Sequence, residues 1–204
     1  MRITKIFKAE CSHRVRNCTT DRCQGLHGHS YVFELTFEGD PVNQANMVMD
    51  FSVLKEFIKP FIDSFDHTHM FCDNEPDTYR QFVTNECGRW ISAPFNWSCE
   101  MMALMIFAYV QRMFNRTNFS NGENPDIVGV KVWETATGNC VVDSLDVHDF
   151  WNPEWFDKIV FSDGIIKDWP EILRNHIMFG TEMTTKKVEK YICNETFERD
   201  IQGY

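Results

Sequence analysis

The sequence lacks any run of apolar residues long enough to cross a membrane. A membrane-spanning helix needs about 20 consecutive apolar residues, and no such run occurs in the 204 residues. The segment from Met1 to Lys8 also lacks the long apolar stretch of a signal peptide. We therefore expect a cytoplasmic protein with no membrane association.

Basic residues are scarce. The chain has 20 lysines and arginines against 30 aspartates and glutamates, which makes its net charge −10 at pH 7. Nucleic-acid-binding proteins usually present a basic face, so we expect no nucleic-acid partner. An anionic small-molecule substrate would require a local cationic pocket.

Eight cysteines are present, but none stands in a CxxC pair. In a chain of this length without an export signal, a disulfide framework is disfavoured. Apart from Cys23, we expect the cysteines to be buried or idle thiols: Cys11, Cys18, Cys72, Cys87, Cys99, Cys140 and Cys193.

Apolar periodicity predicts the main elements, because strands repeat every two residues and helices every three to four. Strands are expected at 3–9, 31–38, 127–134 and 140–142, and helices at 50–65 and 98–114. Pro60 should kink or end the first helix. Strands adjacent in sequence suggest antiparallel pairing with both helices on one face, an α+β fold. The aromatic-rich residues after 150 are predicted to pack on the core or on a neighbouring subunit.

The segment His27-Gly28-His29 carries the strongest chemical signal. Two histidines at i and i+2 of a strand project from the same face, and His13 lies upstream, on a strand that could pair alongside. Three neutral imidazoles with a vacant fourth position are typical of catalytic zinc. Alternatively, Cys23 is a fourth ligand, which would make a closed structural site.

Two further features have both a chemical and a plain interpretation. Asp66 stands beside His67, where a carboxylate fixes the tautomer of an imidazole and raises its basicity; the plain alternative is a surface pair. Glu134 ends a valine-rich strand, where its carboxylate could accept two N–H donors from the amino-amide edge of a pterin. Alternatively, Glu134 is solvated at the strand end.

Taken together and in this order, the motifs resemble the 6-pyruvoyl/6-carboxy-tetrahydropterin synthase family. The similarity covers about residues 2–145, and its Leu26–Tyr31 segment looks most like the bacterial 6-carboxy branch of queuosine synthesis. The matching motifs are His13, Cys23 ahead of His27-Gly28-His29, Asp50-Phe51 with Leu54-Lys55, Asp66-His67, Ser98-Cys99-Glu100 and Glu134-Thr135.

The resemblance implies a role for each matching residue. His13, His27 and His29 would bind Zn2+. Cys23 would be the thiolate that abstracts a proton, and Asp66 and His67 the acid–base couple. Glu134 would anchor the pterin ring, and Ser98 to Glu100 would border its pocket. The implied substrate is 7,8-dihydroneopterin triphosphate, which loses triphosphate and, in the 6-carboxy branch, also acetaldehyde.

The resemblance also implies the tunnelling fold, an antiparallel four-stranded sheet with two helices on one face. Subunits of that fold assemble into barrels of three chains, stacked as a hexamer with active sites between subunits. We expect residues 1–149 to form the catalytic domain and 150–204 a C-terminal extension. Two alternatives stay open: the 6-pyruvoyl reaction, and a non-catalytic adaptor whose structural zinc site uses one cysteine and three histidines.

Overall fold

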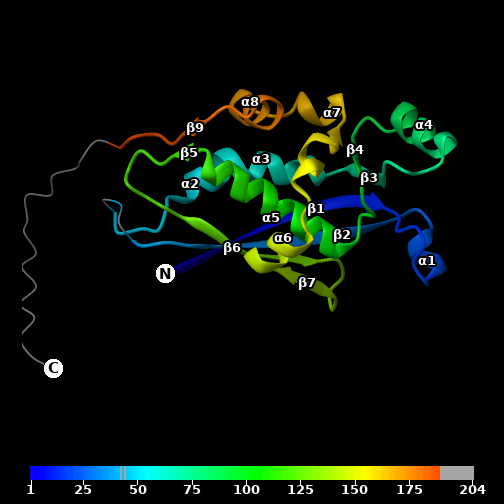
Figure 1. Ribbon diagram of the computed structural model, residues 1–204, viewed down its shortest axis with the longest axis horizontal. Coiled ribbons are helices and arrows are strands. Elements are labelled where there is room, and N and C mark those ends of the chain that lie inside the picture. The colour runs from blue at the N-terminus through cyan, green and yellow to red at the C-terminus, as the bar shows by residue number, and fades with distance from the viewer. Residues whose placement is uncertain (42, 44, 189–204) are drawn as a thin grey trace, which may run out of the picture.

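The structure, a computed structural model, describes residues 1–41, 43 and 45–188. Its main feature is a seven-stranded mixed sheet in the order β7-β6-β2-β1-β3-β4-β8 (Figure 1). The strands of this sheet are β1 (Arg2–His13), β2 (His27–Glu38), β3 (Thr68–Cys72), β4 (Trp90–Ala93), β6 (Asp126–Trp133), β7 (Asn139–Val142) and β8 (Val160–Phe161). A separate parallel pair joins β5 (Thr117–Asn118) to β9 (Met183–Thr184).

The helices connect and cover these strands. They are α1 (Asp21–Gln24), α2 (Phe51–Val53), α3 (Lys59–Ile62), α4 (Asp77–Glu86), α5 (Cys99–Asn115), α6 (Ser144–Phe150), α7 (Asp163–Ile166) and α8 (Glu171–Phe179). A π-helical turn, Leu54–Ile58, lies between α2 and α3, and 3-10 turns occupy Asp63–Phe65 and Pro153–Asp157. No helix in the described part of the chain is both long and apolar enough to span a membrane.

The predicted antiparallel unit is present, but it is only part of the sheet. β1, β2, β6 and β7 pair antiparallel in that spatial order, as expected. The expectation of a purely antiparallel four-stranded sheet is wrong, because β3 pairs parallel to the end of β1 and β4 parallel to β3. β3 is buried at all five positions, so it lacks the alternation by which a strand is recognised in a sequence.

The two predicted helices form and cover one face of the antiparallel unit (Figure 1). Asp50 caps the first, since its side chain accepts from the Ser52 N–H at 2.7 Å. The π-helical turn directly precedes α3, and Pro60 stands in the first turn of α3, where a missing N–H costs least. The predicted interruption at Pro60 therefore takes the form of a locally widened helix. α5 supplies a long buried stripe against β6 and β7.

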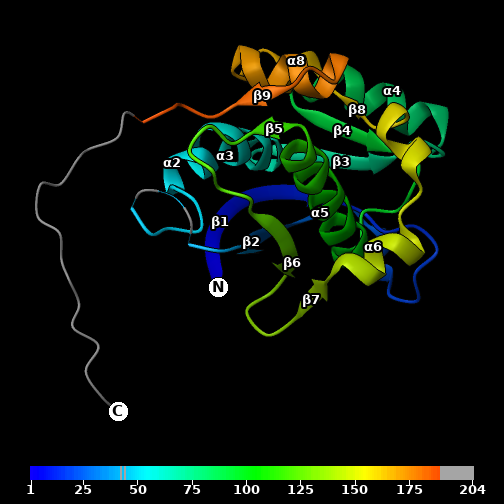
Figure 2. The same ribbon diagram turned by 60° about the vertical axis from the view of Figure 1, so that its left-hand side comes forward.

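The described part of the C-terminal segment packs on the core, which was one of the two expectations; the other was packing on a neighbouring subunit. β8 extends the main sheet by pairing with β4, and α7 and α8 lie on the side of the molecule where β3 and β4 are found (Figure 2). Its aromatic side chains Trp151, Phe161 and Trp169 belong to the hydrophobic core. Cys193 and the rest of 189–204 lie outside the described residues, and the division of the chain at residue 149 stays a prediction.

Candidate metal centre

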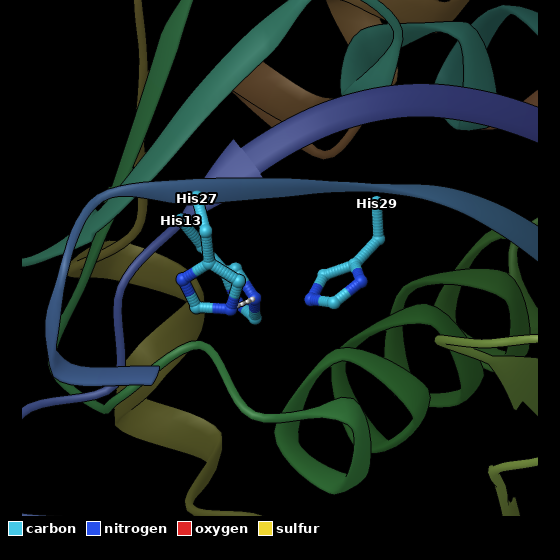
Figure 3. Close-up of side chains that lie close together, drawn as sticks. All are labelled: His13, His27 and His29. Atoms are coloured by element: carbon cyan, nitrogen blue, oxygen red, sulfur yellow. Dashed lines mark hydrogen bonds between the residues drawn. The ribbon is translucent and has the colours of Figure 1, made fainter. Parts of the chain in front are cut away.

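Pairing of β1 with β2 brings the three predicted metal-binding histidines together. His13, the last residue of β1, lies opposite His27, the first residue of β2, and His29 lies opposite Cys11. Directly opposed residues share a face of the sheet, so all three imidazoles project to the side of α5 (Figure 3). One nitrogen from each ring lies within 4.8 Å of the others. The predicted cluster is therefore present.

Backbone carbonyls orient two of the rings. The Nδ1 of His13 lies 2.5 Å from the carbonyl oxygen of Trp97, and the Nδ1 of His27 lies 2.9 Å from that of Gly25. A carbonyl only accepts hydrogen bonds, so each Nδ1 must carry the proton, which leaves each Nε2 with a free lone pair. Metal-binding histidines usually donate their other ring N–H to a carbonyl or carboxylate oxygen in this way.

Apart from the Tyr31 hydroxyl near His13, the free nitrogens have no hydrogen-bond donor among the described residues. The Nε2 atoms of His13 and His27 lie 3.1 Å apart, a separation at which two lone pairs repel unless a cation lies between them. The Nε2 of His29 is buried and has no hydrogen-bond partner among the described residues. A buried polar atom without a partner is unfavourable by about 1–3 kcal/mol. A divalent cation that prefers nitrogen ligands would satisfy all three atoms.

Burial also keeps two of these imidazoles neutral. Desolvation lowers the pKa of His13, although the hydrogen bond to Trp97 acts in the opposite direction. Desolvation likewise lowers the pKa of His29. Metal ligation requires the neutral imidazole, so both rings are ready to bind at neutral pH.

Glu134 and Tyr31 lie against the histidine cluster. Glu134 follows β6 by one residue, and its Oε1 lies 3.7 Å from the Nε2 of His13 and 3.8 Å from that of His29. The Tyr31 hydroxyl donates to the same Oε1 at 3.2 Å and lies 3.3 Å from the Nε2 of His13. Burial raises the pKa of Tyr31, so its hydroxyl stays a donor. Sequence reasoning placed Tyr31 in a strand but missed its position beside the histidines. Its place two residues after His29, which puts both side chains on one face of β2, is the signal that could have revealed it.

Cys23 belongs to the connection between β1 and β2. It lies on α1, is partly exposed, and precedes by two residues the Gly25 carbonyl that orients His27. Its own carbonyl accepts from the Val15 N–H at 2.8 Å. Within the described residues, the set of mutually close ligand atoms is formed by the histidines alone. The seven cysteines that the structure describes are all free thiols.

Asp66 and His67 do form a couple, but on the other face of the strand pair. The Oδ2 of Asp66 lies 2.9 Å from the Nδ1 of His67. His67 borders a cavity of about 560 Å3 together with Glu10 and Ser12. The side chains of Glu10 and Ser12 alternate along β1 with those of Cys11 and His13. The couple therefore lies on the face of β1 opposite to the His13 side chain, beside a cavity that His29 also lines.

The segment from Ser98 to Glu100 starts α5. The Ser98 hydroxyl accepts from the Met101 N–H at 3.4 Å and so caps the helix. Glu100 is exposed in the first turn. Trp97, just before the cap, provides the carbonyl that orients His13. Sequence reasoning missed this role because a main-chain acceptor has no residue-type signature.

Comparisons with known proteins agree on one group of relatives. A family model described as 6-pyruvoyl tetrahydropterin synthase matches residues 2–144. Over 177 residues the chain is 37% identical to 6-carboxy-5,6,7,8-tetrahydropterin synthase of Helicobacter pylori strain J99, covering 83% of this chain and 86% of that protein. It is 31% identical over 153 residues to the Aquifex aeolicus protein of the same name, covering 66% and 93%.

A solved structure supports the fold. The crystal structure of an uncharacterized protein from Wolinella succinogenes matches with a TM-score of 0.57 and 18% sequence identity. The match covers 71% of this chain and 98% of that chain. At this level of identity, the similarity establishes a shared fold.

Proposed function

Since this chain belongs to the 6-pyruvoyl tetrahydropterin synthase family, we propose that it is a zinc-dependent lyase of the 6-carboxy-5,6,7,8-tetrahydropterin synthase type. Its proposed substrate is 7,8-dihydroneopterin triphosphate, within queuosine synthesis. The names of the relatives that share 30% or more of their residues over most of their own length support the 6-carboxy branch. The convergence of three histidine nitrogens, with two rings oriented by carbonyls, carries the proposal.

The residues present fit a zinc ion. Catalytic zinc is usually bound by three protein ligands, such as imidazole nitrogens, with a fourth position left open. The buried Nε2 of His29 would otherwise have no partner among the described residues. Bound there, zinc would act as a Lewis acid toward oxygen atoms of the substrate side chain. The absence of a cysteine from the cluster supports this open site over the closed structural alternative.

The remaining roles belong to side chains of this chain. Cys23 takes a proton from the side chain of the substrate, and His67, oriented by Asp66, returns one. Glu134 accepts two N–H groups from the amino-amide edge of the pterin, with Tyr31 holding its carboxylate. Ser98 and Glu100 border the ring pocket at the start of α5. Together these groups promote loss of triphosphate and, with the addition of one water molecule, cleavage of the side chain into acetaldehyde and a carboxyl group that stays on the ring.

The couple and the cluster belong to different chains in this proposal. His67 lies beside the face of β1 that carries Glu10 and Ser12, opposite to the His13 side chain, and Asp66 pairs with His67 there. A second copy that docks on this face would bring its own cluster to them. We therefore propose a homo-oligomer, a hexamer by resemblance, in which each site uses residues of two chains.

Product analysis tests the proposed reaction. Purified protein is loaded with zinc and incubated with 7,8-dihydroneopterin triphosphate. Release of acetaldehyde with formation of 6-carboxy-tetrahydropterin is expected. Formation of 6-pyruvoyl-tetrahydropterin without acetaldehyde would assign the chain to the other branch, and recovery of unchanged substrate would contradict both.

Cys23→Ala separates the catalytic site from a structural one. We expect the variant to retain zinc and to lose turnover by about 10²-fold or more, because general base catalysis contributes that much. Cys18→Ala is the matched control, because Cys18 lies in the same connection and its thiol donates to the Thr20 carbonyl. This control should keep both its zinc and its turnover. Loss of zinc from the Cys23 variant would show that Cys23 is a ligand.

A further inference from the structure

The turn that carries Asp66 and His67 has a strained backbone. His67 has a φ of 53°, in the left-handed region that residues other than glycine seldom occupy. Such a conformation persists only where surrounding contacts enforce it. One restraint comes from β1, because the His67 N–H donates to the Glu10 carbonyl at 2.7 Å and the Glu10 N–H donates to Asp66 at 2.9 Å.

Arg89 provides a second restraint. Its Nε donates to the carbonyl of Asp66 at 3.0 Å, and its Nη2 donates to the carbonyl of Asp63 at 2.9 Å. The remaining nitrogen, Nη1, donates to the Gly164 carbonyl at 3.1 Å and to the Asp168 carboxylate at 2.5 Å. The guanidinium therefore joins the turn, residues 63–67, to the C-terminal segment.

Trp169 provides a third restraint. Its indole Nε1 donates to the Ser64 hydroxyl at 2.7 Å, and the side chain is buried with its ring 4.9 Å from that of Phe161. A buried indole N–H requires an acceptor, and Ser64 lies in the turn. The hydrogen bond therefore fixes the turn against the aromatic core of the C-terminal segment.

Close backbone contact allows these restraints to form. A Cβ atom at position 164 would collide with the Gly88 carbonyl oxygen, so α7 reaches Arg89 only because Gly164 has no side chain. The Ser162 hydroxyl also accepts from the Trp90 N–H at 3.0 Å. All these residues of the segment follow residue 144, where the family match ends.

We propose that Gly164, Asp168 and Trp169 form a clamp that positions the Asp66–His67 couple for proton transfer, an inference that rests on the proposed function of that couple. The clamp touches no substrate, so its members are positioning residues. Without it, the strained backbone of His67 relaxes and the imidazole loses its alignment. The C-terminal segment is thus part of the machinery for turnover as well as part of the core.

Trp169→Phe tests the clamp with a closely matched control. Phenylalanine keeps the aromatic packing and removes the N–H donor to Ser64. Trp151→Phe makes the same chemical change in the same segment, but the buried Nε1 of Trp151 has no hydrogen-bond partner among the described residues. Asp168→Asn is a second variant, which weakens the hold on Arg89 and leaves the core untouched, because Asp168 is exposed.

Two measurements are made on the zinc-loaded full chain. The first is hydrogen exchange of the peptide spanning residues 63–68, measured by mass spectrometry. This measurement reports on the mobility of the turn even if the protein does not act on a pterin. The second is steady-state kinetics with 7,8-dihydroneopterin triphosphate. Trp169→Phe and Asp168→Asn should speed exchange in this peptide and lower kcat about tenfold, since small displacements of a catalytic group reduce rates strongly. KM and zinc content should stay within about twofold of the wild-type values, because these substitutions remove no contact to the substrate or the metal.

The outcomes separate the clamp from the proposed function. Faster exchange and lower kcat in the two clamp variants, with neither change in Trp151→Phe, support the clamp. The clamp is overturned if residues 63–68 exchange at the same rate in Trp169→Phe and Trp151→Phe. It is also overturned if exchange becomes faster while kcat stays unchanged. If the wild-type protein leaves the pterin unchanged, the proposed function fails, and the exchange measurement still decides whether the segment restrains the turn.

Discussion

At the scale of single residues, main-chain atoms orient the histidines of the candidate metal centre. The carbonyls of Trp97 and Gly25 fix the protons of His13 and His27 on Nδ1 and so direct each Nε2 toward a common point. Any residue type at positions 97 and 25 offers the same acceptor. The orientation of the ligands therefore depends on the path of the backbone rather than on further polar side chains.

His69 is a second buried histidine with a different environment. Its Nδ1 lies 2.9 Å from the Ser12 hydroxyl and its Nε2 lies 2.9 Å from the Tyr79 hydroxyl. A neutral imidazole has one donor and one acceptor, and both are used here. Burial, the largest cause, lowers the pKa of His69 to about 4. The folded protein therefore keeps this ring uncharged well below neutral pH.

We predict that His69 makes the protein sensitive to mild acid. Below about pH 6.5 the unfolded chain binds a proton at this histidine, whereas the folded chain does so only near pH 4. The contribution of the neutral His69 ring to the free energy of unfolding is thus complete above pH 6.5 and is lost as the pH falls toward 4. Between pH 7 and pH 5 the loss is about 2 kcal/mol.

Melting temperatures across this pH range check the prediction. His69→Gln retains polar groups and does not titrate, so its melting temperature should fall less steeply with acid than that of the wild type. His148→Gln is the control, because the side chain of His148 is 84% exposed, and its curve should parallel the wild type. Equal slopes for the wild type and His69→Gln would count against the explanation.

At the scale of elements, the contact between α7 and the connection before β4 decides how the C-terminal segment docks. Position 164 has no room for a side chain, because an added Cβ would collide with the backbone of Gly88. Gly88 itself has open space, with no atom within 4 Å of a Cβ built on it. Two glycines in direct contact therefore have opposite tolerance for substitution.

We predict that Gly164→Ala destabilises the protein and Gly88→Ala does not. The alanine at 164 forces α7 away from the backbone, and overpacking of this kind costs about 1–3 kcal/mol. Thermal unfolding of the two variants, followed by circular dichroism, provides the measurement. A melting temperature for Gly164→Ala that matches those of the wild type and Gly88→Ala would show that α7 docks elsewhere.

At the scale of the whole molecule, the sheet separates the two halves of the proposed site. The histidine cluster faces α5 (Figure 3). His67 borders the cavity beside Glu10 and Ser12. The side chain of His67 is 78% exposed, so it is accessible to another molecule. This arrangement suits a site completed by a second copy of the chain.

Complementation between inactive variants tests this arrangement. His27→Ala removes a proposed metal ligand and His67→Ala removes the proposed acid, so each variant alone should lose at least about 10²-fold in activity. Mixed oligomers, made by co-expression, should regain activity because some sites combine an intact cluster with an intact couple. Mixtures of His27→Ala with His13→Ala are the control, since both lesions lie in the cluster. Mixed oligomers as inactive as this control would contradict a shared site.

Elements with a local residue pattern could be predicted without the structure. Alternation predicted β1, β2 and β6, helical spacing predicted α5, and the HxH spacing predicted two imidazoles on one face of β2. Even there, the bounds differ, because β1 continues to His13 and β2 begins at His27. An irregularity opposite Thr36 and Phe37 also interrupts the alternation of β6, so that Ile127 is buried and Val128 only partly buried. The residues also indicated His13 as the third imidazole and Asp66 as the neighbour of His67, and the resemblance added a role for each.

Which of these groups come together depends on contacts between distant parts of the chain. The parallel strands β3 and β4, the opposite-facing couple and the clamp on residues 63–67 all depend on contacts between distant parts of the chain. Local periodicity carries no information about such contacts, because a fully buried strand has no alternation and a backbone acceptor has no residue type. Residue patterns thus identified the chemistry, and long-range packing set its geometry.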